Sequence, residues 1–94
     1  ANPLRMAIVN RLDDREMAAS ALISALGISK ANLSKHMTLL VQAGIAECRR
    51  EGRQAFYRLV DPDIRKACAI MSTVLYRRLK RGEKLASVLS VAKA

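Results

Sequence analysis

The first half of the chain repeats apolar residues at helical spacing, which predicts three short helices. These run from Asn2-Pro3 to Asp13-Asp14, from Glu16 to Leu26, and from Ser29 to Gly44. Ser29 can cap the third helix with its hydroxyl, and Gly44 can end it in the left-handed conformation. A short turn that contains Gly27 separates the second and third helices, which is typical of a helix-turn-helix. An ordinary helical hairpin would show the same pattern.

The third helix has two unlike faces. Leu33, Met37, Leu40 and Val41 share the apolar face. The other face carries short polar or basic side chains and no carboxylate: Ala31, Ser34, Lys35, Thr38 and Gln42. Such a face can enter the major groove of DNA without repelling phosphate, although an amphipathic surface helix would also present it to solvent.

After Gly44 the hydrophobic pattern alternates, as in strands. Two strands are expected at 45–50 and 55–60, joined by the turn Glu51-Gly52-Arg53-Gln54. Four arginines surround this turn: Arg49, Arg50, Arg53 and Arg58. They indicate either a solvated basic hairpin or a wing whose guanidinium groups bind phosphate.

A long last helix is expected from Asp61-Pro62 to about Arg81, with Gly82 closing it. Its apolar residues cover about half of its circumference, more than one packing partner needs: Ile64, Ala67, Cys68, Ile70, Met71, Val74, Leu75 and Leu79. A second subunit would cover the part of this apolar surface that the rest of the chain leaves exposed. The expected dimer residues are Met6 and Val9 of the first helix together with Ile64, Cys68, Met71 and Leu75. Residues 1–82 are expected to form the DNA-binding and dimerisation domain, and 83–94 a C-terminal tail.

The charge of the chain narrows the class of partner. Its 94 residues include 17 Lys and Arg against 8 Asp and Glu, which gives a net charge of +9. In so short a chain this predicts a polyanionic partner, either nucleic acid or an anionic membrane surface. No apolar run is long enough to span a membrane, and two cysteines are too few for a secreted disulfide scaffold. A cytoplasmic location is therefore expected.

The order of these segments resembles the ArsR/SmtB family of winged helix-turn-helix repressors. The matching stretches are Asn2-Pro3-Leu4-Arg5, Leu26-Gly27-Ile28-Ser29, Leu33-Ser34-Lys35-His36-Met37, Ala43-Gly44-Ile45, Arg49-Arg50-Glu51-Gly52-Arg53 and Phe56-Tyr57-Arg58-Leu59. The resemblance implies a mainly α fold with a small β-hairpin, dimeric through its terminal helices. It also implies a homodimer that binds a palindromic operator in double-stranded DNA and leaves it when an effector binds. The residues expected to contact DNA are Ser29, Lys30, Ala31, Asn32, Ser34, Lys35, Thr38, Gln42, Arg49, Arg50, Arg53 and Gln54.

The chain departs from the family at its sensor sites. Ala18 and Ser20 stand where the family's thiolate site has two cysteines, so arsenite or a soft metal lacks its ligands there. The single histidine, His36, lies in the third helix, where the resemblance implies a structural hydrogen bond rather than a metal ligand. No metal site and no cofactor are therefore expected. Cys48 and Cys68 remain as either packing residues or a thiol switch.

The sequence leaves three functions open, and the leading one is a dimeric DNA-binding transcriptional repressor. The alternatives are a non-regulatory nucleic-acid binder, architectural or RNA-binding, and a winged-helix protein-interaction module. An enzyme is not expected, because one histidine and no paired carboxylates supply no acid–base or nucleophilic group of residues.

Overall fold

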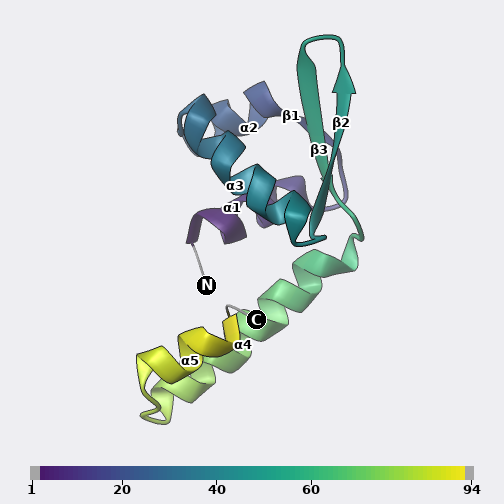
Figure 1. Cartoon of the computed structure of the whole chain (residues 1–94). Helices are drawn as coiled ribbons and strands as arrows, with labels where there is room; N and C mark the ends of the chain where they lie inside the picture. Colours follow the sequence, from purple (N-terminus) through teal and green to yellow (C-terminus); the bar gives the residue numbers. More distant parts are fainter. Residues whose placement is uncertain (1–2, 93–94) are drawn as a thin grey trace.

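The computed structural model describes residues 3–92, with side chains to Val88. Its elements are α1 (Pro3–Leu12), β1 (Met17–Ala18), α2 (Ala19–Leu26), α3 (Lys30–Gln42), β2 (Ala46–Glu51), β3 (Gln54–Leu59), α4 (Asp63–Lys80) and α5 (Leu85–Ala92). Figure 1 shows α1, α2 and α3 gathered into one body with a β-hairpin beside it. Helices α4 and α5 lie side by side below that body. The expected fold, mainly α with a small β-hairpin, is confirmed.

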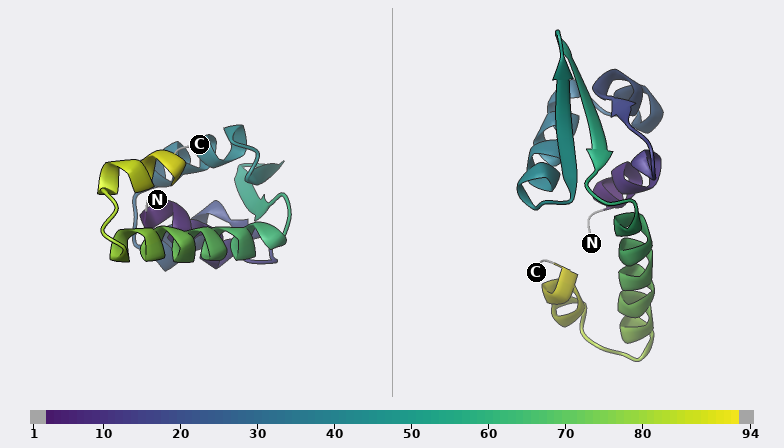
Figure 2. Two further views of the ribbon diagram at one scale, coloured as in Figure 1. Left: turned by 90° about the horizontal axis from the view of Figure 1, so that it is seen from below. Right: turned by 90° about the vertical axis from the view of Figure 1, so that its right-hand side faces the viewer.

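The three strands form an antiparallel sheet in the order β1-β3-β2. Ala46 pairs with Leu59 at the base of the β2–β3 hairpin and Glu51 pairs with Gln54 at its end, so the loop has two residues. Gly52 occupies that loop with φ 59°, a left-handed conformation that glycine adopts without steric cost. The hairpin projects beyond the helices (Figure 2).

One aliphatic core joins the helical body to the base of the sheet. Its buried residues are Ile8, Val9, Leu12, Leu22, Leu33, Met37, Leu40, Ala46 and Leu59. Val9 was expected at a subunit interface, and this prediction is wrong. Its side chain is 2% exposed within a single chain, so nothing is left for a partner to cover. Met6 of the same helix is half-buried.

The turn between α2 and α3 forms as predicted. Gly27 ends α2 with φ 64° and ψ 35°, and its N–H donates to the Ile23 carbonyl at 2.9 Å. The Ser29 hydroxyl then accepts from the backbone N–H of Asn32 at 3.0 Å and caps α3. Gly44, with φ 75°, follows the end of α3. These local interactions hold α3 in place beside α2.

Two elements differ from the sequence prediction. The helix expected from Glu16 begins only at Ala19, because Met17 and Ala18 pair with Tyr57 and Phe56 as strand β1. Much of the C-terminal tail, residues 85–92, is the helix α5.

Helix α4 leaves the body and gives the molecule an elongated shape of 50 × 25 × 22 Å (Figure 1). Near its start, Ile64 and Cys68 pack against the core. Further along, Leu75 is buried outside that core, as is Val88 of the adjoining α5. Leu75 is 7% exposed within one chain, so it has little surface left for a second subunit and its assignment to the dimer contact is wrong. Ile64 and Cys68 are half-buried, and their place at a subunit interface stays a prediction. No helix within the described part of the chain is long and apolar enough to cross a membrane.

Candidate nucleic-acid interface

Helix α3 presents its polar face to solvent. Every residue of this helix and its cap that was expected to contact DNA is exposed: Ser29, Lys30, Ala31, Asn32, Ser34, Lys35, Thr38 and Gln42. Leu33, Met37 and Leu40 are buried on the opposite side. Val41, which the sequence assigned to the buried face, is 38% exposed. The face is continuous and has no acidic side chain.

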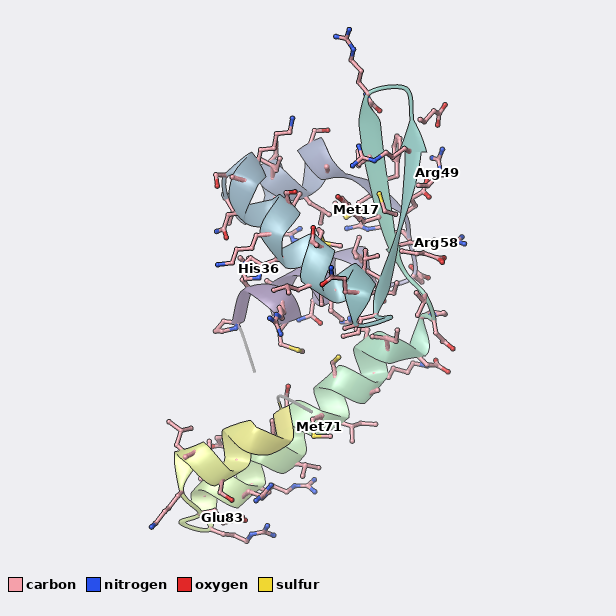
Figure 3. All side chains as sticks on the ribbon, in the orientation of Figure 1. Met17, His36, Arg49, Arg58, Met71 and Glu83 are labelled. Atoms are coloured by element: carbon pink, nitrogen blue, oxygen red, sulfur yellow. The ribbon has the colours of Figure 1, made fainter. Side chains whose placement is uncertain are left out.

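Two polar side chains of α3 have restricted hydrogen-bonding roles. The Thr38 hydroxyl donates to the Ser34 carbonyl at 2.8 Å, so it presents mainly its methyl group and an acceptor oxygen to solvent. His36, labelled on α3 in Figure 3, is half-buried, and its Nδ1 has no hydrogen-bond partner among the described residues. The structural hydrogen bond implied for His36 is therefore not found at Nδ1.

The strand pairing assigns the hairpin arginines to different faces. Side chains alternate along β2, so Ala46, Cys48 and Arg50 share the face that packs on the helices at its base. Glu47, Arg49 and Glu51 lie on the opposite face, named here the outer face of the sheet. Arg50 is therefore the arginine of β2 that lies on the same face as Ala46 and Cys48, toward the helices.

Arg53 lies in the hairpin loop close to the start of α3. It lines a hollow of about 250 Å³ together with Lys30, Gln54 and the first residues of α2. Lys30 and Arg53 are both exposed. The fold therefore brings the loop of the hairpin and the N-terminus of α3 around one depression, with a cation from each.

Arg49 occupies a different environment on the outer face. Its Nε and Nη2 atoms donate to the Glu16 carboxylate at 3.2 and 2.7 Å, and its Nη1 donates to Glu51 at 2.7 Å. The hydrogen bond from Arg49 is the main reason that the pKa of Glu16 lies below its usual value, and Glu16 in turn raises the pKa of Arg49. On the same face Arg58 forms an ion pair with Glu47.

Acidic side chains are absent from α2 and α3. All eight acidic residues lie outside residues 17–46, the stretch that contains α2 and α3. Asp13, Asp14, Glu16 and Glu47 surround one hollow of about 310 Å³ that also touches Arg58. The side formed by α3 and the hairpin loop carries Lys30, Lys35, Arg50 and Arg53. A polyanion is attracted to this cationic side.

The two cysteines lie in unlike surroundings. Cys48 is an exposed thiol beside Tyr57, whose pKa is raised by burial and further by Cys48. Cys68 is half-buried against the core. Both are free thiols. Within residues 3–92 no three His, Cys, Asp or Glu side chains gather in a way that could hold a metal ion.

The comparisons with known proteins agree with this geometry. Residues 1–49 match the family model described as a helix-turn-helix domain. The HTH-type transcriptional regulator Rv0081 of Mycobacterium tuberculosis is 34% identical over 80 residues, which cover 84% of this chain and 70% of that protein. The repressor SmtB of the same organism is 36% identical over 61 residues, 65% of this chain and 45% of SmtB.

Solved structures extend the similarity to the fold. The crystal structure of Rv0081 has a TM-score of 0.70 at 33% identity and covers 86% of this chain and 82% of that one. The homodimeric winged helix-turn-helix domain of Mb0332 from Mycobacterium bovis, a candidate ArsR-family regulator, has a TM-score of 0.68 at 30% identity, covering 86% and 75%. This chain belongs to the ArsR/SmtB family of winged helix-turn-helix transcriptional regulators.

In this ArsR/SmtB protein α2 and α3 form the helix-turn-helix and the β2–β3 hairpin is the wing. The sequence predicted both elements but left the wing arginines as one group. It missed Glu16 and Phe56, which hold Arg49 on the outer face. The alternation of charged residues along β2 was the available signal, because it separates Arg49 from Arg50.

Proposed function

We propose that this chain is a homodimeric transcriptional repressor that binds a palindromic operator in double-stranded DNA. The observation that carries the proposal is the exposed, acid-free face of α3, which lies beside the cations of the wing. Short polar side chains and Lys35 on this face can reach base edges in the major groove. Lys30, Arg50 and Arg53 can bind the phosphates on either side.

The second subunit is proposed to dock on α4. Ile70, Met71 and Val74 lie on one side of this helix and are 65%, 44% and 40% exposed. Exposed apolar side chains in a contiguous stripe favour a protein partner. Among the solved relatives, the Mb0332 domain is homodimeric. A two-fold dimer would present two copies of α3 to successive major grooves, about 34 Å apart.

Repression and release are proposed from the relatives. SmtB of Mycobacterium tuberculosis is named a transcriptional repressor, and so is BigR of Xylella fastidiosa, whose structure has a TM-score of 0.68 at 30% identity and covers 78% of this chain and 74% of BigR. In this protein an effector would lower operator affinity by binding better to a dimer whose recognition helices are mispositioned for DNA.

The deciding experiment is selection of bound sequences from random duplex DNA. We expect enrichment of an inverted repeat whose half-sites lie about one helical turn apart. Binding without any enriched sequence and with a steep salt dependence would instead identify a non-regulatory nucleic-acid binder. No binding to duplex DNA, together with capture of a protein partner, would identify a protein-interaction module. Either result would refute the proposed function.

A further inference from the structure

Arg49 ties together three parts of the chain on the outer face of the sheet. Glu16 precedes β1, and Arg49 and Glu51 belong to β2. Because β3 lies between β1 and β2, the Arg49–Glu16 pair crosses the central strand. The Arg49 guanidinium carbon lies 4.5 Å from the ring centroid of Phe56, the β3 residue over which it passes. Arg49, Glu16, Glu51 and Phe56 are named here the outer-face clamp.

The contacts of the clamp restrict the orientation of the Arg49 side chain. Arg49 engages Glu16 with two donor atoms, which fixes the plane of its guanidinium group. A third donor atom is taken by Glu51, and the ring of Phe56 supports the flat face. The Nε, Nη1 and Nη2 atoms of Arg49 therefore all donate hydrogen bonds to carboxylates in the absence of DNA.

We infer that Arg49 is a positioning residue, which holds the wing at a fixed angle to α2 and α3 through Glu16 and does not itself bind DNA. This inference rests on the proposed function, because the wing matters only if it binds DNA. The strand alternation supports it, since Arg50 and not Arg49 is on the helix side of β2. Glu16 lies directly before β1 and α2, so the clamp connects the wing to the start of the helix-turn-helix.

A direct phosphate contact by Arg49 is the competing role, and the two roles predict opposite effects of Glu16→Gln. If Arg49 binds phosphate, Glu16 competes with DNA for its guanidinium group, and removing that carboxylate strengthens binding. If Arg49 positions the wing, removing the carboxylate loosens the hairpin and weakens binding, although a negative charge has been lost. The sign of the change therefore separates the two roles.

The test measures the Kd of the full chain for its selected duplex as a function of salt. Asp14→Asn is the matched control, because it removes an exposed carboxylate close to Glu16 without touching the clamp. We expect Glu16→Gln and Arg49→Gln each to raise Kd by about three- to tenfold with an unchanged salt slope. We expect Asp14→Asn to leave Kd unchanged or lower it. Tighter binding by Glu16→Gln, or a salt slope about one unit smaller per protomer in Arg49→Gln, would overturn the inference.

Arg49→Lys separates charge from geometry. Lysine keeps the positive charge but cannot bridge two carboxylates in a plane. We expect Arg49→Lys to weaken DNA binding about as much as Arg49→Gln does. Binding by Arg49→Lys equal to that of the parent would mean that charge alone matters, and the positioning role would be refuted.

Amide hydrogen exchange without DNA gives a readout that does not depend on the proposed function. We expect Glu16→Gln and Arg49→Gln to speed exchange at the amides that pair β1 with β3 and β2 with β3, while α1 and α2 keep their protection. Unchanged exchange in the sheet would refute the clamp. If the parent protein fails to select any duplex, the proposed function fails, and hydrogen exchange still decides whether the clamp holds the sheet.

Discussion

In the proposed interface, Lys35 is the cation that we expect to read a base. It is exposed near the middle of α3, on the face with Ala31, Ser34 and Thr38. A lysine at such a position can donate to guanine O6 or N7, and its loss affects one base pair more than the others. The neighbouring cations, by contrast, lie at the edges of the proposed interface.

We predict that Lys35→Ala weakens operator binding by about 1–3 kcal/mol and changes the base preferred at one position of each half-site. The measurement is Kd for a panel of single-base operator variants. Lys66→Ala, an exposed lysine on α4, is the matched control and should bind like the parent. An unchanged base preference in Lys35→Ala would contradict the assignment of α3 as the reading element.

Arg53 has a different predicted effect because it lies in the wing loop beside Lys30. We predict that Arg53→Ala weakens specific and nonspecific DNA binding to a similar extent. We also expect it to lower the salt slope by about one unit per protomer. Titrations against operator and random duplexes at several salt concentrations measure both quantities. Loss of specific binding alone would show that Arg53 reads bases.

The cysteines can be tested as a pair. A thiol switch predicts that oxidation lowers the operator affinity of the parent but not of a Cys48→Ser, Cys68→Ser double variant. Cys48 is the exposed thiol, so Cys48→Ser alone should remove most of such a response. Identical behaviour of parent and double variant under reducing and oxidising conditions would establish both cysteines as packing residues.

At the scale of elements, the Gly27 turn sets the relation between α2 and α3. Among the described residues, no atom outside its chain neighbours lies within 4 Å of where its Cβ would be, so the turn requires glycine for its backbone conformation and not for space. We predict that Gly27→Ala lowers the free energy of unfolding by about 1–2 kcal/mol, because φ 64° is unfavourable for alanine. Gly27→Asn should cost less, since asparagine tolerates this conformation. Urea unfolding measures both, and equal stability of the alanine and asparagine variants would argue against a backbone origin.

The elements that could be predicted from sequence are those fixed by neighbouring residues. Ser29, Gly27 and Gly44 mark the ends of α2 and α3 through interactions within a few positions, and the structure confirms each. The alternation in 45–60 likewise predicted the hairpin and its loop. In the candidate interface, the exposure of the α3 face followed from the spacing of Leu33 and Met37.

The sequence did not predict what depends on distant pairing. Met17 and Ala18 become a strand only because β3 lies beside them, some forty residues along the chain. Glu16 and Arg49 are 33 positions apart, so their ion pair was not visible in a local pattern. Leu75 was assigned to a second subunit because nothing in the sequence showed that α5 would lie beside α4.

At the scale of the whole molecule, α4 links the winged helix-turn-helix body to the proposed dimer contact. We predict that Met71→Glu, at a labelled position on α4 in Figure 3, yields a monomer in sedimentation and loses tight operator binding. Tyr76→Glu is the matched control, because Tyr76 is exposed on the opposite side of the same helix. A folded Met71→Glu monomer that keeps its preference for the palindrome would contradict the proposed dimer.

The absence of acidic residues from α2 and α3 leaves Lys30, Lys35 and Arg53 without nearby carboxylates on the side that carries α3 and the wing loop. In the field of a DNA duplex this local positive charge favours approaches in which α3 meets the phosphates first. Encounters would then begin with the recognition helices already facing the groove. Movement along nonspecific DNA would need little reorientation at each step, and the search for an operator would become faster at low salt than at high salt.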